Sequence, residues 1–126
     1  PVADLAEQAR AIDWVDVPQQ ALFERGGNLF EWYADAKVNA CYNAVDRHVE
    51  NGRADQAAII YDSPITDTKQ TITFAELQIR VSRLAGALLA QGVTAGDRVI
   101  IYMPMVPEAI EAMLACARIG AVHSVV

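Results

Sequence analysis

The chain has 126 residues, of which 53% are hydrophobic and 21% charged, and its formal net charge is −6. A chain of this length can build one modest folding unit, and its composition is that of a globular rather than a disordered protein. The acidic balance leaves no broad basic surface for a phosphate backbone, which excludes nucleic acid as a partner. No apolar run reaches the roughly 18 to 20 residues that cross a bilayer, so we expect no membrane segment and a cytoplasmic location.

The two cysteines, Cys41 and Cys116, are far apart in the sequence and have unlike neighbours. They indicate neither a disulfide framework nor a zinc site. Cys116 lies in the apolar run MLACARIG, where a thiol is usually a small buried hydrophobic group. We therefore predict no metal-binding role for either thiol.

The first part of the chain, residues 1–53, shows only broken helical periodicity and predicts an arm of short helices and loops. Residues 5–12 fit a helical turn or two, and residues 38–49 fit another short helix. Pro18 and the turn-forming pair Gly26 and Gly27 interrupt the pattern between them. Such thin elements cannot bury the large aromatic residues of this part, so we expect them to pack on a larger body: Trp14, Phe23, Phe30, Trp32 and Tyr33.

A regular pattern begins with an apolar run of strand type, residues 57–61. The polar stretch DSPITDTK, residues 62–69, separates it from a second strand candidate at residues 71–73. The two runs predict a hairpin with a long polar loop. Within this loop, Ser63 and Thr66 are interpreted as turn formers.

The clearest helix start is marked by Thr73 and Glu76, whose spacing is that of a capping box. The helix is predicted to begin at Phe74 and to stop at Gly92, which readily adopts the left-handed conformation of a helix end. One face is apolar at helical spacing: Leu77, Val81, Leu84 and Leu88. The other face carries polar residues: Gln78, Arg80 and Arg83.

The run RVIIY, residues 98–102, lacks polar alternation, as is typical of a parallel strand covered on both faces. Pro107 fits the first turn of a helix predicted over residues 108–119, which is apolar nearly all round and ends at Gly120. Residues 121–126 begin another extended apolar run. The predicted fold class is α/β: a helical and irregular arm, then β-β-α-β-α-β with a right-handed parallel βαβ crossover.

The nearly all-apolar helix and the final strand need covering layers that a chain of this length can scarcely supply. We therefore expect these residues to be part of a larger α/β domain. The remainder of the same polypeptide would cover them. Without it, the chain would expose an apolar face and self-associate.

The common catalytic and phosphate-binding motifs do not occur in this sequence. It lacks G-x-G-x-x-G and G-x-x-x-x-G-K-[ST], the glycine-rich cradles for phosphate groups. It also lacks H-E-x-x-H and G-x-S-x-G, so a zinc hydrolase and a serine hydrolase have no support. We predict no catalytic, cofactor-binding or metal-binding residue in this chain.

The two histidines and one pair of carboxylates are the remaining candidates for chemistry. His48 lies near the end of a predicted helix, where a partial positive charge interacts well with the helix dipole, so a structural role is predicted. His123 is expected near the C-terminal end of a parallel strand, where ligands bind in open α/β sheets. With no partner carboxylate or nucleophile nearby in the sequence, we assign it a packing or supporting role. Glu108 and Glu111 are interpreted as a solvated pair at a helix start.

Several stretches of the sequence resemble short-chain acyl-CoA synthetases. One of them is YMPMVPEAIEAMLACARIGAVHSVV, residues 102–126, which resembles a signature of the acyl-CoA synthetase branch of the adenylate-forming enzymes. The first core motif of that superfamily resembles ITFAELQ, residues 72–78, and its usual continuation resembles GVTAGDRVIIYMP, residues 92–104. The opening segment of acetyl- and propionyl-CoA synthetases is similar to NACYNAVDRHV, residues 39–49. The hairpin IIYDSPITDTKQTITF, residues 59–74, resembles propionyl-CoA synthetases more than acetyl-CoA synthetases.

The resemblance implies an N-terminal fragment of a propionyl-CoA synthetase, with acetyl-CoA synthetase as the alternative. Residues 1–53 would be the arm typical of these enzymes, and residues 54–126 the truncated start of the AMP-binding α/β domain. The enzyme would use ATP, CoA and Mg²⁺ to convert a small carboxylate to acyl-CoA through an acyl-adenylate, in the cytoplasm or, in a eukaryote, the mitochondrial matrix.

In this family the phosphate loop, the acyl pocket and the catalytic lysine lie downstream. We therefore expect residues 1–126 alone to bind no cofactor and to be catalytically inactive. Their partner would be the remainder of the polypeptide. Two other interpretations are a non-catalytic α/β interaction module and a nucleotide-binding domain in its own right. The apolar final strand argues against the closed core of a module, and the missing phosphate loop argues against the nucleotide-binding domain.

Overall fold

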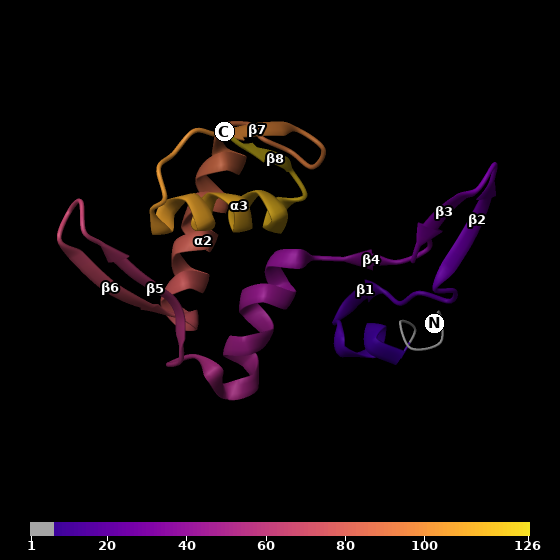
Figure 1. The fold of residues 1–126 in the computed structure, drawn as a ribbon, viewed down its shortest axis with the longest axis horizontal. Coiled ribbons are helices and arrows are strands. Elements are labelled where there is room, and N and C mark those ends of the chain that lie inside the picture. Colours follow the sequence, from indigo (N-terminus) through magenta and orange to yellow (C-terminus); the bar gives the residue numbers. More distant parts are fainter. Residues whose placement is uncertain (1–6) are drawn as a thin grey trace. The chain divides into compact units, whose positions relative to one another are not determined.

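The computed structural model describes residues 7–126, and the chain divides into two compact units between Asn39 and Ala40 (Figure 1). Within the described residues, no helix combines the length and the apolar character that spanning a bilayer requires. The two units are described separately below.

The first unit is built mainly of short strands. A single 3₁₀ turn, η1 (Ala9–Ala11), precedes β1 (Trp14–Asp16), which pairs with β4 (Lys37–Val38) in antiparallel fashion. Between them, β2 (Leu22–Gly26) and β3 (Leu29–Trp32) form an antiparallel hairpin. The prediction of helices and loops was therefore wrong for this part, apart from the turn at η1; residues 5 and 6 of that predicted turn lie outside the described residues. Strands of two to five residues are too short to show a period of two in the sequence.

The turn between β2 and β3 confirms the role predicted for the glycine pair. Gly26, Gly27 and Asn28 all have positive φ angles, of 83°, 61° and 63°. Glycine adopts this left-handed region without a steric cost, and asparagine tolerates it better than most residues. The turn brings Arg25 and Glu31 within 2.7 Å in an exposed ion pair.

Some aromatic residues of the first unit contact one another, but their side chains are not all buried. The Trp14 indole N–H donates to the Ala9 carbonyl at 2.8 Å, and its ring lies 5.4 Å from that of Tyr33 between centroids. Trp32 lies 6.3 Å from the same tyrosine ring, but both Trp32 and Phe30 remain half exposed. The expectation that these aromatic residues pack on a larger body stays a prediction.

The second unit begins with a helical segment, residues 40–53, which contains two π-helical stretches, η2 (Tyr42–Asp46) and η3 (Val49–Arg53). The helix predicted over residues 38–49 thus starts two residues later, since Val38 belongs to β4, and it continues further. The segment is kinked at Asn51 and Gly52, whose backbone angles are not helical, with a φ of 78° at Gly52. These residues were assigned to the arm, whereas the structure groups them with the second unit.

The predicted hairpin is confirmed, with a tighter connection than expected. The strands β5 (Ala57–Ser63) and β6 (Thr68–Thr73) pair in antiparallel fashion as far as Ser63 and Thr68, so the loop shrinks to residues 64–67. Ser63 therefore ends a strand, and its assignment as a turn former was wrong. Thr66 lies in the turn, where its carbonyl accepts from the Thr68 hydroxyl at 3.2 Å.

The helix α2 (Phe74–Ala90) begins at the predicted residue. The Glu76 N–H donates to the Thr73 hydroxyl at 3.2 Å, and the Thr73 N–H donates to the Glu76 carboxylate at 2.8 Å. Both bonds of a capping box are present, and each satisfies an N–H that has no partner within the helix. At the other end, Gly92 adopts a φ of 87°, as predicted for the stop.

The parallel βαβ unit is also confirmed, because β7 (Arg98–Ile101) and β8 (Val122–Val125) pair in parallel with α3 (Pro107–Ile119) between them. Pro107 occupies the first turn of α3, where no N–H is needed. Gly120 ends it at a φ of 76°. The handedness of the crossover stays a prediction.

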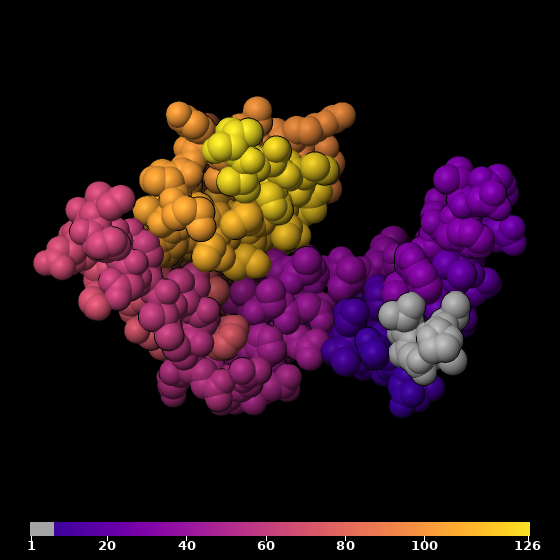
Figure 2. Space-filling view, viewed as in Figure 1, coloured from indigo at the N-terminus to yellow at the C-terminus, as the bar shows by residue number. Residues whose placement is uncertain are grey.

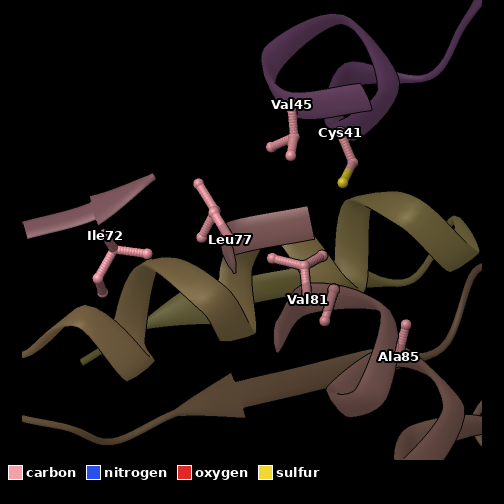
Figure 3. Packing of buried hydrophobic residues seen from close by; sticks show 7 residues of the cluster. Cys41, Val45, Ile72, Leu77, Val81 and Ala85 are labelled. Atoms are coloured by element: carbon pink, nitrogen blue, oxygen red, sulfur yellow. The ribbon is translucent and has the colours of Figure 1, made fainter. Parts of the chain in front are cut away.

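The core of the second unit lies where α2, α3 and the helical segment 40–53 meet. Figure 3 shows Cys41 and Val45 directed from that segment toward α2. The buried cluster takes one residue from β6, three from α2 and one from α3: Ile72, Leu77, Val81, Ala85 and Ala115. Leu77 and Val81 were predicted on the apolar face. Leu84 and Leu88 pack against the cluster while partly buried.

The strand pair β7–β8 is less covered than its sequence predicts. Ile101 is buried, but Ile100 is 71% exposed and all four residues of β8 are exposed. Figure 2 shows β8, in yellow, at the surface of the second unit. The described residues therefore cover one face of β7 and leave apolar side chains in contact with solvent, although the pattern RVIIY is typical of a strand covered on both faces.

Candidate functional site

The most connected group of polar side chains links three helical elements. Arg118 of α3 approaches Asp46 of η2 through its Nη2 atom, which lies 2.9 Å from Oδ1 and 2.7 Å from Oδ2. Both side chains are largely buried, with 25% and 14% of their surface exposed. From α2, the Gln78 amide donates to Asp46 at 2.9 Å and the Ser82 hydroxyl accepts from Arg118 at 3.0 Å. We call these four residues the Asp46 cluster.

The Asp46 cluster was missed by the sequence analysis, which placed Gln78 on the polar face of α2 and gave no partner to Asp46. The sequence does contain a signal for this cluster, since Arg118 is the one charged residue in the second half of α3, residues 112–119. A buried charge in such a helix requires a counter-charge and further hydrogen bonds. The structure supplies both, so the cluster has the character of a structural ion pair rather than of a reactive centre.

Both cysteines are buried, which confirms the interpretation of Cys116 as a small hydrophobic residue. Burial raises the pKa of the Cys41 thiol, an effect opposed by a hydrogen bond and the positive charge of Arg118. Burial also raises the pKa of the Cys116 thiol. Because the thiolate is the nucleophile and the metal ligand, these neutral thiols are suited to packing and not to reaction.

The two carboxylates at the start of α3 differ in their exposure to solvent. Glu108 is exposed, whereas Glu111 is only 8% exposed and lies 3.3 Å from the Arg80 guanidinium of α2. The interpretation of both as a solvated pair was therefore wrong for Glu111. The sequence could not show this, because the partner that replaces water comes from a different helix. Arg80, placed on the polar face of α2, is half-buried by the same contact.

His48 lies near the end of regular helix, as predicted, because Asn51 and Gly52 have non-helical backbone angles. Its ring centroid is 4.9 Å from that of Phe74, and its Nδ1 is 3.2 Å from the Arg53 guanidinium, which also lies over the Phe74 ring. Partial loss of solvation, followed by the positive charges of Arg53 and Arg47, lowers the pKa of His48. The structural role predicted for His48 fits these contacts, but the predicted benefit of a positive charge there was wrong.

His123 is the second residue of β8 and is exposed. It stands opposite Val99 of β7, with Ser124 and Val125 following it in the strand. The expectation that it lies near the C-terminal end of the strand was therefore wrong. Its packing or supporting role stays a prediction.

The described residues do not assemble a recognisable reaction centre. Across residues 7–126, no three side chains of histidine, cysteine, aspartate or glutamate gather so as to hold a metal ion. The charged groups brought together by the fold, in the Asp46 cluster and in the contact of Arg80 with Glu111, are neutralised by one another. The prediction that this chain supplies no catalytic, cofactor-binding or metal-binding residue stays a prediction.

Comparison with known proteins decides the family. The family described as "AMP-binding enzyme" matches residues 45–126, and that described as "Acetyl-coenzyme A synthetase N-terminus" matches residues 5–44. The chain belongs to the AMP-binding enzyme family. The two matches follow one another along the sequence and together leave few residues unassigned, as expected for the N-terminal region of a short-chain acyl-CoA synthetase.

Named relatives agree with this assignment. "Acyl-CoA synthetase short-chain family member 3, mitochondrial" of Rattus norvegicus is 54% identical over 118 residues, which cover 94% of this chain and 17% of the relative. "Acetyl-coenzyme A synthetase" of Streptomyces avermitilis is 50% identical over 121 residues, 96% of this chain and 18% of the relative. The chain thus spans less than a fifth of the length of these two relatives.

A solved structure supports the α/β fold. "Acetoacetyl-CoA Synthetase from Streptomyces lividans" superposes with a TM-score of 0.81 at 30% sequence identity, covering 99% of this chain and 18% of that one. The predicted fold class, the N-terminal α/β part of an acyl-CoA synthetase, is confirmed by this match. The Streptomyces avermitilis relative is named for the acetyl group and the Streptomyces lividans structure for the acetoacetyl group. These two proteins therefore share the family but not the acid in their names.

Proposed function

We propose that this chain is the N-terminal part of an AMP-forming short-chain acyl-CoA synthetase that acts on propionate. The observation that carries the proposal is the consecutive match to the acetyl-coenzyme A synthetase N-terminus and to the AMP-binding enzyme family. In the first step, a carboxylate oxygen attacks the α-phosphorus of ATP and pyrophosphate leaves. In the second step, the thiol of CoA attacks the acyl carbon and AMP leaves, giving the thioester.

The two-step route has a simple chemical reason. A carboxylate oxygen is a poor leaving group, whereas AMP is a good one, so activation divides one difficult substitution into two easier ones. Mg²⁺ would neutralise the charge of the phosphates in such a reaction. The described residues hold no group of acidic side chains suited to a metal, so we assign no residue of this chain to Mg²⁺ and no step to it.

Propionate is favoured by the hairpin formed by β5 and β6. Its sequence, IIYDSPITDTKQTITF, resembles that of propionyl-CoA synthetases, and this is an argument from lineage. The second candidate is acetate, which is favoured by the 50% identity to the acetyl-coenzyme A synthetase of Streptomyces avermitilis. We further propose a cytoplasmic location, or the mitochondrial matrix if the source is a eukaryote.

The contribution of these residues would be structural. The Asp46 cluster and the buried cluster around Val81 hold two long helices against the segment 40–53, and β7 and β8 extend from that support. We propose that this scaffold carries the loops that perform the chemistry in the remainder of the polypeptide. The chain alone would then bind neither ATP nor CoA.

The test is steady-state kinetics of the full-length protein with ATP, CoA and acetate, propionate or butyrate. The proposal predicts formation of AMP and acyl-CoA, with the largest kcat/KM for propionate. A largest kcat/KM for acetate would support the second candidate. Absence of acyl-CoA with all three acids would remove the proposed function. Residues 1–126 alone, tested by ATP–pyrophosphate exchange with propionate, are expected to show no exchange.

A further inference from the structure

The kink of the helical segment 40–53 places an asparagine and a glycine side by side at the surface of the second unit. Asn51 and Gly52 are both exposed. The backbone angles are φ −85° and ψ 18° at Asn51, and φ 78° and ψ 18° at Gly52. Glycine commonly ends a helix in this left-handed conformation, which carries a steric cost for other residues. The backbone therefore favours a glycine directly after Asn51.

An asparagine followed by a glycine can lose its side-chain amide without an enzyme. The backbone nitrogen of the glycine gives up its proton and attacks the side-chain carbonyl carbon, Cγ, of the asparagine. A C–N bond forms, the bond from Cγ to the amide nitrogen breaks, and ammonia leaves with the proton, so that a cyclic succinimide remains. Water then opens the ring. Addition of water at Cγ gives aspartate, whereas addition at the backbone carbonyl carbon gives isoaspartate, whose main chain runs through the side-chain carbons.

The surroundings of Gly52 leave room for this reaction. At a ψ of 18° the Gly52 nitrogen lies on the side of the Asn51 backbone nitrogen and not on that of Cβ, so attack requires rotation about the Cα–C bond of Asn51. Apart from the chain neighbours, no atom of the described residues lies within 4 Å of the position that a Cβ of Gly52 would take. The rotation is therefore a local opening at an exposed helix end, where the cost of opening is low.

We propose that Asn51 is a site of spontaneous deamidation, with water as the only co-reactant. The reaction needs neither ATP nor CoA, so this inference does not rest on the proposed function. It assigns to the chain a chemical modification that depends on time and pH.

The modification would act on the connection between the helical segment 40–53 and α2. Directly after Gly52, the Arg53 guanidinium lies 5.6 Å from the centre of the Phe74 ring, and its Nε donates to the Gln56 side chain at 2.7 Å. The Phe74 N–H donates to the Gln56 carbonyl at 3.1 Å. Isoaspartate lengthens the main chain just before these contacts, and both products add a negative charge. We therefore expect deamidation to weaken this connection.

The test is peptide mass spectrometry of the full-length protein during incubation at mildly alkaline pH. The deamidated fraction is measured from the mass increase that replaces an amide by a carboxylate, and chromatography separates the peptides that contain isoaspartate from those that contain aspartate. Asn28 is the internal control, because it is also exposed in a turn, with a φ of 63°, but is followed by Leu29.

We expect Asn51 to deamidate at least about tenfold faster than Asn28, because Gly52 has no side chain to hinder the attack. Isoaspartate is expected among the products. Equal rates at the two asparagines would overturn the proposal. Aspartate as the sole product would indicate direct hydrolysis and would overturn the succinimide route.

The variant Asn51→Gln tests the consequence for stability. It keeps an exposed amide but would have to close a larger ring, so position 51 is expected to stay unmodified over the same period. After incubation, the unaltered protein should melt at a lower temperature than a fresh sample, whereas Asn51→Gln should not change. An equal loss in both proteins would overturn the proposed effect on the connection to α2.

Discussion

Arg118 and Asp46 are 72 positions apart in the sequence, yet the guanidinium Nη2 of one lies 2.7 Å from the carboxylate Oδ2 of the other. The contact joins α3 to the helical segment 40–53, and Gln78 of α2 donates to the same carboxylate. The match to the AMP-binding enzyme family begins at residue 45, just before Asp46. The ion pair therefore connects the beginning of this region to α3, near the end of this chain.

Replacement of Arg118 by methionine is predicted to destabilise the second unit. The variant Arg118→Met leaves the Asp46 carboxylate largely buried without its counter-charge. We expect a loss of about 2–3 kcal/mol in the free energy of unfolding. This is less than the usual loss for a fully buried pair, because a quarter of the Arg118 side chain is exposed. Chemical denaturation of this chain measures the loss. The matched control is Arg83→Met on the exposed face of α2, expected to change stability by less than about 0.5 kcal/mol. Equal effects of both variants would contradict the assignment.

The capping box of α2 is predicted to contribute to stability through Thr73. The variant Thr73→Ala removes the hydroxyl that accepts from the Glu76 N–H, at an expected cost of about 1 kcal/mol. Thr71→Ala, an exposed position in the same strand, is the control and should be milder. The measurement is again the free energy of unfolding, and a larger loss for Thr71→Ala would speak against a role for the cap.

Acid is predicted to weaken the contacts of His48. Its pKa in the folded protein lies below the ordinary 6.5, so the folded state favours the neutral ring that accepts from Arg53. The unfolded chain takes up a proton more readily, and the associated stability is fully present above 6.5 and is lost as the pH falls from there toward the lower folded pKa.

The measurement for His48 is the melting temperature as a function of pH. The variant His48→Gln does not titrate in this range, and its melting temperature should change less across the same interval. Parallel pH profiles of the two proteins would show that His48 has no part in the acid response.

Close approach of α2 and α3 depends on small residues, so a larger side chain between them is predicted to be harmful. Ala115 is fully buried in the cluster that contains Val81, and Ala115→Leu should cost about 1–3 kcal/mol by forcing neighbouring side chains or helices apart. The control Ala87→Leu enlarges an exposed position of α2 and should cost less than about 0.5 kcal/mol. Thermal unfolding of both variants decides; a harmless Ala115→Leu would mean that the helices are loosely packed.

Local signals in the sequence were sufficient wherever a few neighbouring residues decide the conformation. The Thr73 and Glu76 spacing located the start of α2 to the residue, and Pro107 and Gly120 marked the two ends of α3. The short strands of the first unit were missed because their pairing partners, and not their own two to five residues, define them. The opposite error at the hairpin has the same cause, since pairing of Ser63 with Thr68 shortened a loop that composition alone made long.

By itself, the sequence determined the α/β class, the parallel crossover, the helix ends and the resemblance to acyl-CoA synthetases, because these depend on periodicity, capping and motifs that are local in the chain. Only the tertiary structure decided which charged residues are buried and paired. Glu111 and Asp46 look like solvated carboxylates until Arg80 and Arg118 approach them from other helices. Burial is a property of segments that meet in space, and no stretch of one helix contains that information.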